Sequence, residues 1–227
     1  MIFNLANSIC IIIGSLIGVL LKKGIPERIK NSLISAMGLC VLLIGISLAL
    51  KGNNILIIVL SVAVGTLIGE FLDLDTKINT LGEKLQEKFK DSDNARFAEG
   101  FATASILFCA GAMGVVGSLN VGLSGNGDTL LVKGLIDGVI ASLFATAFGI
   151  GVLFSSVSVF IYQAVFIILA SILSKYLGPE VIASVNGVGG ITVIGIGLNL
   201  SIKSDIKVAN IAPAIFIPMI LSLFGIH

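Results

Sequence analysis

The sequence predicts an all-α, polytopic membrane protein with about eight transmembrane helices in a single transmembrane domain, residues 1–227. Of its 227 residues, 56% are hydrophobic and only 12% are charged, whereas a soluble domain carries roughly 25% charged residues. The mean hydropathy is +1.10. Because so few polar side chains cannot coat a water-facing surface, the lipid bilayer is the expected surrounding medium and the first expected partner.

Eight apolar stretches approach the length of about 20 residues that a helix needs to cross a bilayer. They cover residues 2–21, 31–50, 54–73, 97–119, 132–154, 157–174, 181–202 and 206–225. The run 134–174 has one charge, Asp137, and is too long for one span. We therefore expect a turn at Ser155–Ser158, where serines cluster.

Lysine and arginine residues are distributed unevenly over the loops. With the N-terminus outside, eleven of the 14 basic residues fall in inner loops, and the outer side holds only Lys51, Lys133 and Lys175. The positive-inside rule then places both termini outside the cytoplasm. It also places the polar stretch 74–96 in the cytoplasm, where its helical apolar spacing predicts an amphipathic connector that lies on the membrane or docks a partner.

Short similar segments recur about 150 residues apart. GIPE (24–27) and LGPE (177–180) follow the first and sixth helices, and IGISLAL (44–50) and IGIGLNL (194–200) close the second and seventh. A shift of five helices reverses orientation, so an inverted-topology repeat is predicted, as in many secondary transporters. Its copies are the first repeat, 1–73, and the second, 157–227, on either side of central helices 97–154. The alternative is chance similarity between helices rich in Gly, Leu and Ile.

Glycine is abundant, with 27 residues, and several glycines lie at small-xxx-small spacing. Close helix packing is the expected role of three such pairs, Gly14–Gly18, Gly65–Gly69 and Gly134–Gly138. Two clusters also contain polar side chains, at 111–120 in the fourth helix and 186–190 in the seventh. These glycines either interrupt their helices, so that backbone groups line a cavity, or allow close packing.

Asp137 is the deepest ionisable residue, and it either lies on a pathway or forms an ion pair with Lys133, four residues earlier. Glu70 and Glu99 are expected to reach the interface. Asn199 lies near the inner end of the seventh helix, where capping or an interhelical bond is the usual role. The candidate substrate or ion pathway comprises Gly111, Gly114, Gly117, Ser118, Asn120, Asp137, Asn186, Gly189, Gly190 and Asn199.

Other classes of function lack the residues that they need. The net charge is +1, so no nucleic-acid partner is expected. The only histidine is His227, and Cys10, Cys40 and Cys109 share no metal-like spacing, so we expect no metal, no cofactor and no enzymatic centre. A Walker-type phosphate loop is also absent from the sequence, which argues against direct use of ATP.

Several strings resemble one bacterial family. LFCAGAMGVVGSLNVGLSGN (107–126), LLVKGLIDG (130–138), FGIGVLFSSVSVFIYQ (148–163), VNGVGGITVIGIGLNL (185–200) and ANIAPA (209–214) resemble the YdfK/YqgA-like inner-membrane family, domain of unknown function 554. The resemblance covers essentially the whole chain and implies a bacterial cytoplasmic (inner) membrane protein. The family motif positions correspond here to Gly111, Ala112, Met113, Gly117, Ser118, Lys133, Asp137, Gly138, Gly149, Gly151, Gln163, Gly189, Gly190, Gly195, Asn199, Asn210 and Pro213.

The expected function is that of a small secondary transporter or channel for a small polar solute or ion. One alternative is a non-transporting scaffold or sensor that acts through the cytoplasmic segment 74–96. Another is an intramembrane enzyme, for which no nucleophile–base pair is visible in the sequence. A homodimer is plausible because a chain of 227 residues has little surface with which to enclose a path.

The charge distribution makes a testable prediction about topology. Alkaline phosphatase fused after residue 225 should be active, because that end is expected outside, while the same enzyme fused after Lys23 should be inactive. Phosphatase activity of whole cells, with green fluorescent protein fusions as the inverse readout, measures this. The opposite pattern at both sites would overturn the predicted orientation.

Overall fold

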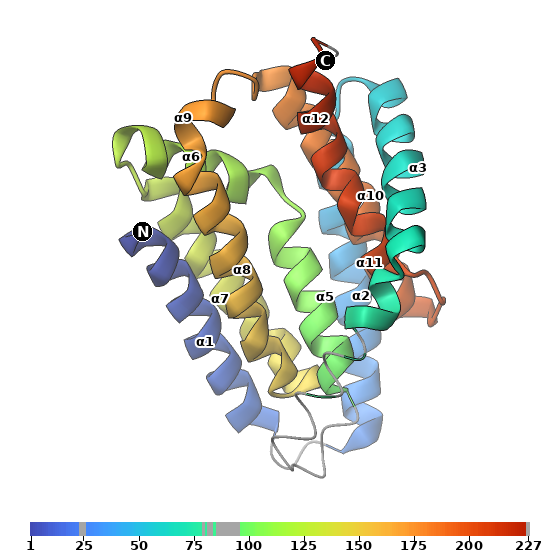
Figure 1. Cartoon of the computed structure of the whole chain (residues 1–227). Coiled ribbons are helices and arrows are strands. Elements are labelled where there is room, and N and C mark those ends of the chain that lie inside the picture. Colours follow the sequence, from blue (N-terminus) through green and yellow to red (C-terminus); the bar gives the residue numbers. More distant parts are fainter. Residues whose placement is uncertain (23–25, 79, 81–83, 85–95, 226–227) are drawn as a thin grey trace.

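The computed structural model describes residues 1–22, 26–78, 80, 84 and 96–225, and every regular element in these ranges is a helix (Figure 1). The elements are α1 (Ile2–Lys22), α2 (Glu27–Ala49), α3 (Ile55–Leu72), α5 (Phe97–Cys109), α6 (Ala112–Ser124), α7 (Asp128–Phe148), α8 (Gly151–Ile168), α9 (Ala170–Leu173), α10 (Pro179–Ile202), α11 (Val208–Ile211), the 3₁₀-helix η1 (Ala212–Phe216) and α12 (Ile217–Leu223). The predicted all-α class is confirmed.

Within the described ranges, six helices are long and apolar enough to cross a membrane: α1, α2, α3, α7, α8 and α10. The bent pair of α5 and α6 makes a seventh span if it counts as one. The predicted eighth helix is a shorter apolar segment, Val208–Leu223, in which η1 separates α11 from α12. Pro213 and Pro218 fall within this segment, and proline cannot donate the backbone hydrogen bond that a continuous α-helix needs.

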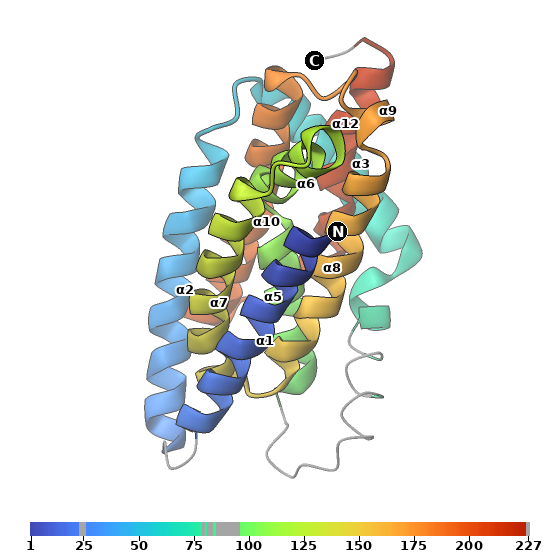
Figure 2. The same ribbon diagram turned by 90° about the vertical axis from the view of Figure 1, so that its left-hand side faces the viewer.

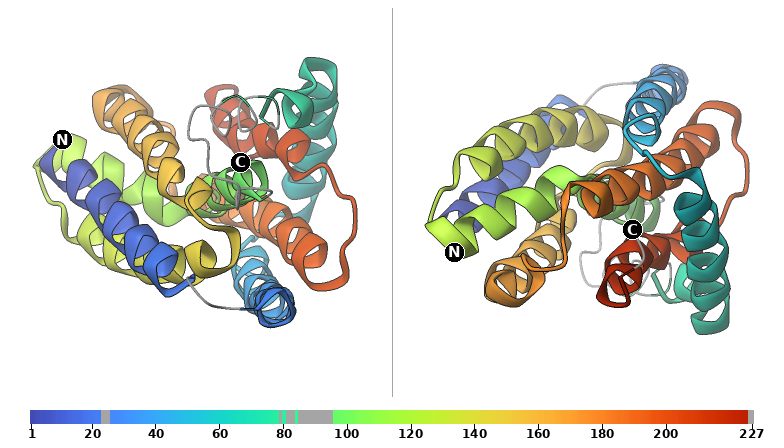
Figure 3. Two further views of the ribbon diagram at one scale, coloured as in Figure 1. Left: turned by 90° about the horizontal axis from the view of Figure 1, so that it is seen from below. Right: turned by 90° about the horizontal axis from the view of Figure 1, so that it is seen from above.

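The helices form two groups with α5 between them, as the end-on views show (Figure 3). In the first group α1 packs on α7 and α8; in the second, α2 packs on α10 and α3 on η1 and α11. α6 runs obliquely across the bundle instead of continuing the direction of α5 (Figure 2). α6 packs on α7 and α8 and therefore belongs to the first group.

Glycines make the closest contact in the first group, where α1 and α7 run parallel. A Cβ atom on Gly14 would overlap the carbonyl oxygen of Gly138, and one on Gly18 would overlap that of Ser142. The Cα of Asn7 lies 3.0 Å from the place that a Cβ of Gly134 would take. The predicted packing role of these glycines is thus confirmed, and it brings the polar end of α1 against α7.

Glycines also line the contact of α10 with its neighbours, but α10 is a continuous helix of 24 residues. A Cβ on Gly189 would overlap the carbonyl oxygen of Ala110, and one on Gly190 would overlap the backbone nitrogen of Ala49 in α2. Of the two interpretations of the 186–190 cluster, an interrupted helix is therefore wrong and close packing is correct. The intrahelical hydrogen bonds persist because neighbouring backbone fills the space that side chains would occupy.

The fourth predicted helix is interrupted. α5 ends at Cys109, and α6 begins at Ala112 after a bend of 60°. Gly111 between them has extended dihedrals, φ −91° and ψ 144°. The second arm continues to Ser124, beyond the expected end at residue 119, until Gly125 adopts φ +73°. Here the glycine cluster does break the helix, at its first member.

The predicted turn at Ser155–Ser158 is wrong, because α8 runs through it. The chain reverses earlier, at Gly149, which has φ +81°, a conformation that favours glycine. The hydroxyl of Ser155 donates to the carbonyl oxygen of Val152, 2.7 Å away, so the serine is accommodated inside the helix.

The inverted repeat stays a prediction. Its proposed equivalents α2 and α10 do lie antiparallel, since Gly38 approaches Leu200 and Gly45 approaches Ile194. Most of the amphipathic connector 74–96, and part of the GIPE segment, lie outside the described residues.

The packing of α1 on α7 makes a second testable prediction. Gly14→Ala should lower the free energy of unfolding by about 1–3 kcal/mol, because the added methyl group must push two backbones apart. Thermal unfolding in detergent measures this as a lower midpoint. Gly178→Ala is the matched control, because a Cβ there meets no atom within 4 Å. Equal midpoints for the two variants would contradict the packing role.

Candidate functional site

A buried ion pair lies on α7, in the first group of helices. The ammonium of Lys133 donates a hydrogen bond to the Asp137 carboxylate one turn later, and each side chain is only 7% exposed. The predicted pairing of these two residues is confirmed. Removing both charges from solvent costs free energy. An ion pair buried inside a membrane domain therefore usually marks a functional site.

The ion pair lies next to the break between α5 and α6. The Lys133 nitrogen lies 6.0 Å from the ring centroid of Phe108, at the end of α5. In the first turn of α6, a Cβ on Gly114 would stand 3.4 Å from Cε of Lys133 and 3.3 Å from Cε1 of Tyr162 in α8. Asn7 of α1 lies near the Asp137 carboxylate. We call Asn7, Lys133, Asp137 and Tyr162 the buried polar centre.

Several buried polar atoms in and beside this centre lack a hydrogen-bond partner among the described residues. They are the hydroxyl of Tyr162 in the centre, the amide of the following residue Gln163 in α8, and the hydroxyl of Ser118, one turn after Gly114 in α6. Gln163 and Ser118 are 0% exposed. Buried polar groups are nearly always hydrogen-bonded, so this concentration indicates a place that takes up water or a polar ligand.

Two hydrogen bonds hold the polar end of α1 against α8. The amide of Asn4 donates to the carbonyl oxygen of Phe160 at 3.0 Å. The hydroxyl of Ser8 donates to the backbone carbonyl oxygen of Ser156 at 3.3 Å. Because Asn7 lies between Asn4 and Ser8 in sequence, these bonds fix the height of its amide relative to the helices around it.

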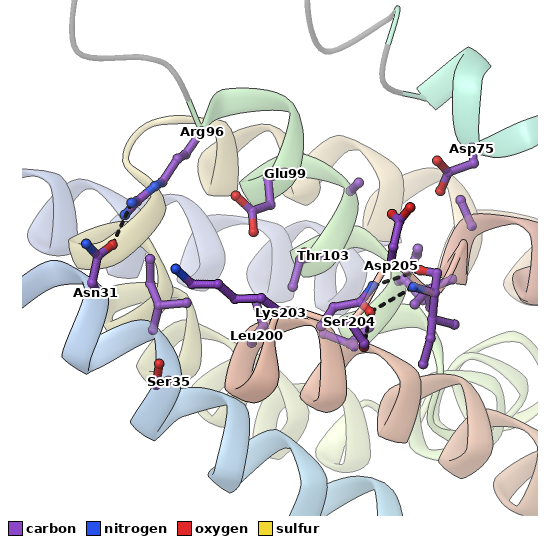
Figure 4. Close-up of a pocket in the computed structure, with 18 of the residues that line it drawn as sticks. Asn31, Ser35, Asp75, Arg96, Glu99, Thr103, Leu200, Lys203, Ser204 and Asp205 are labelled. Atoms are coloured by element: carbon purple, nitrogen blue, oxygen red, sulfur yellow. Dashed lines mark hydrogen bonds between the residues drawn. The ribbon is translucent and has the colours of Figure 1, made fainter.

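A polar pocket of about 880 Å³ opens at one end of the bundle, between α2, α5, α10 and the loop that follows α10 (Figure 4). Its polar lining residues are Asn31, Ser32, Ser35, Asp75, Arg96, Glu99, Thr103, Asn199, Lys203, Ser204 and Asp205. Arg96 donates to the side-chain oxygen of Asn31 at 2.7 Å, which ties the start of α5 to α2. The pocket thus presents charges of both signs to a solute.

The loop after α10 is shaped by one side chain, Asn199. Its amide nitrogen donates to the carbonyl oxygen of Ile206 at 2.7 Å. Its side-chain oxygen accepts from the backbone nitrogen of Ile206 at 3.0 Å and the hydroxyl of Ser204 at 2.7 Å. The loop begins at Lys203, which has the left-handed φ of +56°. Asn199 therefore holds the loop that carries Lys203 and Asp205 into the pocket wall.

α5 connects the pocket with the buried polar centre. Glu99, Thr103 and Ile106 line the pocket along this helix, and Phe108 then reaches Lys133. The pocket lining also includes apolar side chains, among them Ile106 of α5 and Ile196 of α10. Polar and apolar side chains thus share the wall of the pocket.

The predicted pathway residues do not form one continuous site. Gly111, Gly114 and Asp137 lie at the helix break or the ion pair, Ser118 is buried one turn further along α6, and Gly189 supports the break from α10. Asn199 lines the pocket. The others lie elsewhere: Gly117 against Leu130, Gly190 against α2, Asn120 at the exposed surface of α6 and Asn186 half-buried on α10.

Several residues near the ion pair and in the pocket are not predicted by the sequence. Asn7 was not singled out, although Asn4, Asn7 and Ser8 are an unusual polar group in an apolar span, which is the signal that points to them. Tyr162 and Gln163 are neighbours in an apolar span, a pattern that by itself more often marks a hydrogen bond between helices than a site. Lys203 and Asp205 lie in a loop whose fold depends on Asn199, so no local pattern places them in a pocket.

Long apolar helices around a buried charge pair define a polytopic helical membrane protein. The family model described as "Protein of unknown function (DUF554)" matches residues 3–223, so the chain belongs to this family. It is 30% identical over 225 residues to the "Uncharacterized membrane protein YdfK" of Bacillus subtilis (strain 168), covering 97% of this chain and 95% of that protein. It is 32% identical over 220 residues to the "Uncharacterized protein YqgA" of Escherichia coli (strain K12), covering 95% and 94%. No solved structure gives a significant match.

The ion pair makes a third testable prediction. Lys133→Met or Asp137→Leu alone should lower the free energy of unfolding by about 3–5 kcal/mol, because each leaves one buried charge unpaired. The double variant should recover most of this loss, since it leaves no charge behind. Thermal unfolding of the four proteins in detergent measures the coupling. Additive losses in the double variant would show that the two side chains do not depend on each other.

Proposed function

We propose that the protein is a small secondary transporter or channel that moves a small polar solute or ion across the bacterial cytoplasmic membrane. The observation that carries the proposal is a buried ion pair with unpartnered polar neighbours at a broken helix. Ionisable groups inside a membrane domain are costly and usually mark ion or solute pathways. Interrupted helices at membrane depth are tolerated where protein or a water-filled cavity covers them.

The pocket provides the approach from one end in this proposal. Arg28, Arg96 and Lys203 belong to the helix ends and loops on that side. By the positive-inside rule this end faces the cytoplasm. A solute would move from the pocket along α5, past Ile106 and Ile196, to the buried polar centre.

Access to the centre requires movement of the two helix groups relative to α5. The contact of Gly189 with Ala110 is backbone against backbone, so no side chain of Gly189 itself opposes sliding there. In this proposal the second group, with α2 and α10, shifts against the first group and opens a path between Ile106 and Ile196. This is alternating access in its simplest form.

Flux through purified protein in liposomes tests the proposal, and this is the fourth prediction. Wild-type protein should conduct at least one of chloride, nitrate, formate, sodium, potassium and neutral amino acids. The Lys133→Met/Asp137→Leu double variant should reduce that flux at least about tenfold, equivalent to roughly 1.4 kcal/mol on the barrier.

Glu180→Gln is the matched control, because Glu180 is exposed in the first turn of α10, away from the centre. It should conduct like the wild type. If the folded double variant conducted as much as the wild type, the buried polar centre would not lie on the path. Absence of flux for every solute tested would count against transport itself.

A further inference from the structure

The ammonium of Lys133 has more hydrogen-bond donors than the acceptors that the structure places on it. A lysine ammonium has three N–H donors. In the described part of the chain, the Asp137 carboxylate is the one hydrogen-bond acceptor found for Lys133. With the side chain only 7% exposed, bulk water does not readily satisfy the other two donors. A buried cation in this state calls for a further acceptor.

Other polar side chains lie close to the ion pair. The hydroxyl of Tyr162 is buried and has no partner within the described ranges. The ring of Tyr162 and the Cε atom of Lys133 both contact the first turn of α6 at Gly114. Asn7 is fully buried and approaches the Asp137 carboxylate, the acceptor that Lys133 also uses.

The start of α6 adds backbone donors and a partial positive charge. α6 has 13 residues, and its N-cap, Gly111, provides no side-chain hydrogen bond to the first turn. The first N–H groups of a helix point out of its N-terminus and attract anions. At Gly111 a Cβ would meet nothing within 4 Å, so there is open space beside these donors.

The charges decide which kind of ligand fits. Lys133 and the N-terminus of α6 are positive, and Asp137, the one negative group in the centre, is already bound to Lys133. The other groups that approach the pair are uncharged: Cys109 is a thiol, Tyr162 a phenol and Asn7 an amide. A metal cation would be repelled by the ammonium at short range, whereas an anion would accept the unused donors.

We propose that the buried polar centre binds a small monovalent anion between the Lys133 ammonium, the Tyr162 hydroxyl and the N-terminus of α6. Anions of the size of a halide, nitrate or formate suit a site closed by Gly111 and Gly114. Asp137 holds the ammonium in place when the anion leaves. The anion would be the substrate of the proposed transporter, and that part of the inference rests on the proposed function. Binding of the anion does not depend on transport.

The aromatic composition of the chain supplies a direct probe, and this is the fifth prediction. The protein has no Trp and two Tyr, Tyr162 and Tyr176, so the Tyr176→Phe variant emits from Tyr162 alone. Chloride, nitrate and formate replace gluconate at constant ionic strength in detergent. At least one of them should change the Tyr162 emission along a saturable curve. Exchange of sodium for potassium should leave the emission unchanged.

Two variants in the Tyr176→Phe background separate specific binding from collisional quenching. Lys133→Met/Asp137→Leu should lose the saturable component while it keeps the wild-type unfolding midpoint to within a few degrees. Glu180→Gln should keep both. A response that is linear in anion concentration, or that persists in the double variant, would overturn the anion site, as would no response to any of the three anions.

Liposome flux distinguishes this inference from the proposed function. Saturable binding with anion flux supports both, and Tyr162→Phe should then reduce the anion flux about tenfold without lowering the unfolding midpoint. Saturable binding without any flux would keep the anion site and reject transport. Flux of a cation or a neutral solute, with no saturable response of Tyr162, would keep transport and reject the anion site.

Discussion

A helix that is interrupted inside a bilayer must have its exposed backbone groups covered, and this constraint governs the rest of the structure. α5 ends at Cys109 and α6 begins at Ala112. On one side Gly189 of α10 lies directly on the carbonyl of Ala110, and on the other Lys133 and Tyr162 lie on the first turn of α6. Protein thus surrounds the break, and lipid does not need to solvate it.

The parallel contact of α1 with α7 is the second support of this arrangement. Gly14 and Gly138 allow the two backbones to touch, which draws the polar end of α1 against α7. That closeness buries Lys133 and Asp137 and places Asn7 beside them. The same glycines that pack the helices therefore exclude water from the ion pair. In such low-dielectric surroundings, each donor that lacks an acceptor costs more free energy than it would in water.

The pocket and the buried polar centre are two parts of one proposed path, because α5 lines both. The pocket end is rich in charge and is shaped by the hydrogen bonds of Asn199 to its loop. The centre holds one charge pair, and polar groups that lack partners lie in and beside it. The family match and both relatives extend over nearly the whole chain, so the shared architecture is that of the entire membrane domain.

The sequence by itself determined the membrane class, the positions of most long helices, the packing glycines of α1 and α7 and the four-residue spacing that allows Lys133 and Asp137 to pair. Each of these depends on hydropathy or on spacing within one helix, which are local properties. Only the tertiary structure decided that the glycines at 111–120 break their helix while those at 186–190 do not, because the difference lies in which backbone packs against them. It also decided the turn at Gly149 and the meeting of Asn7, Lys133 and Tyr162, since contacts between distant helices leave no periodic trace in the sequence.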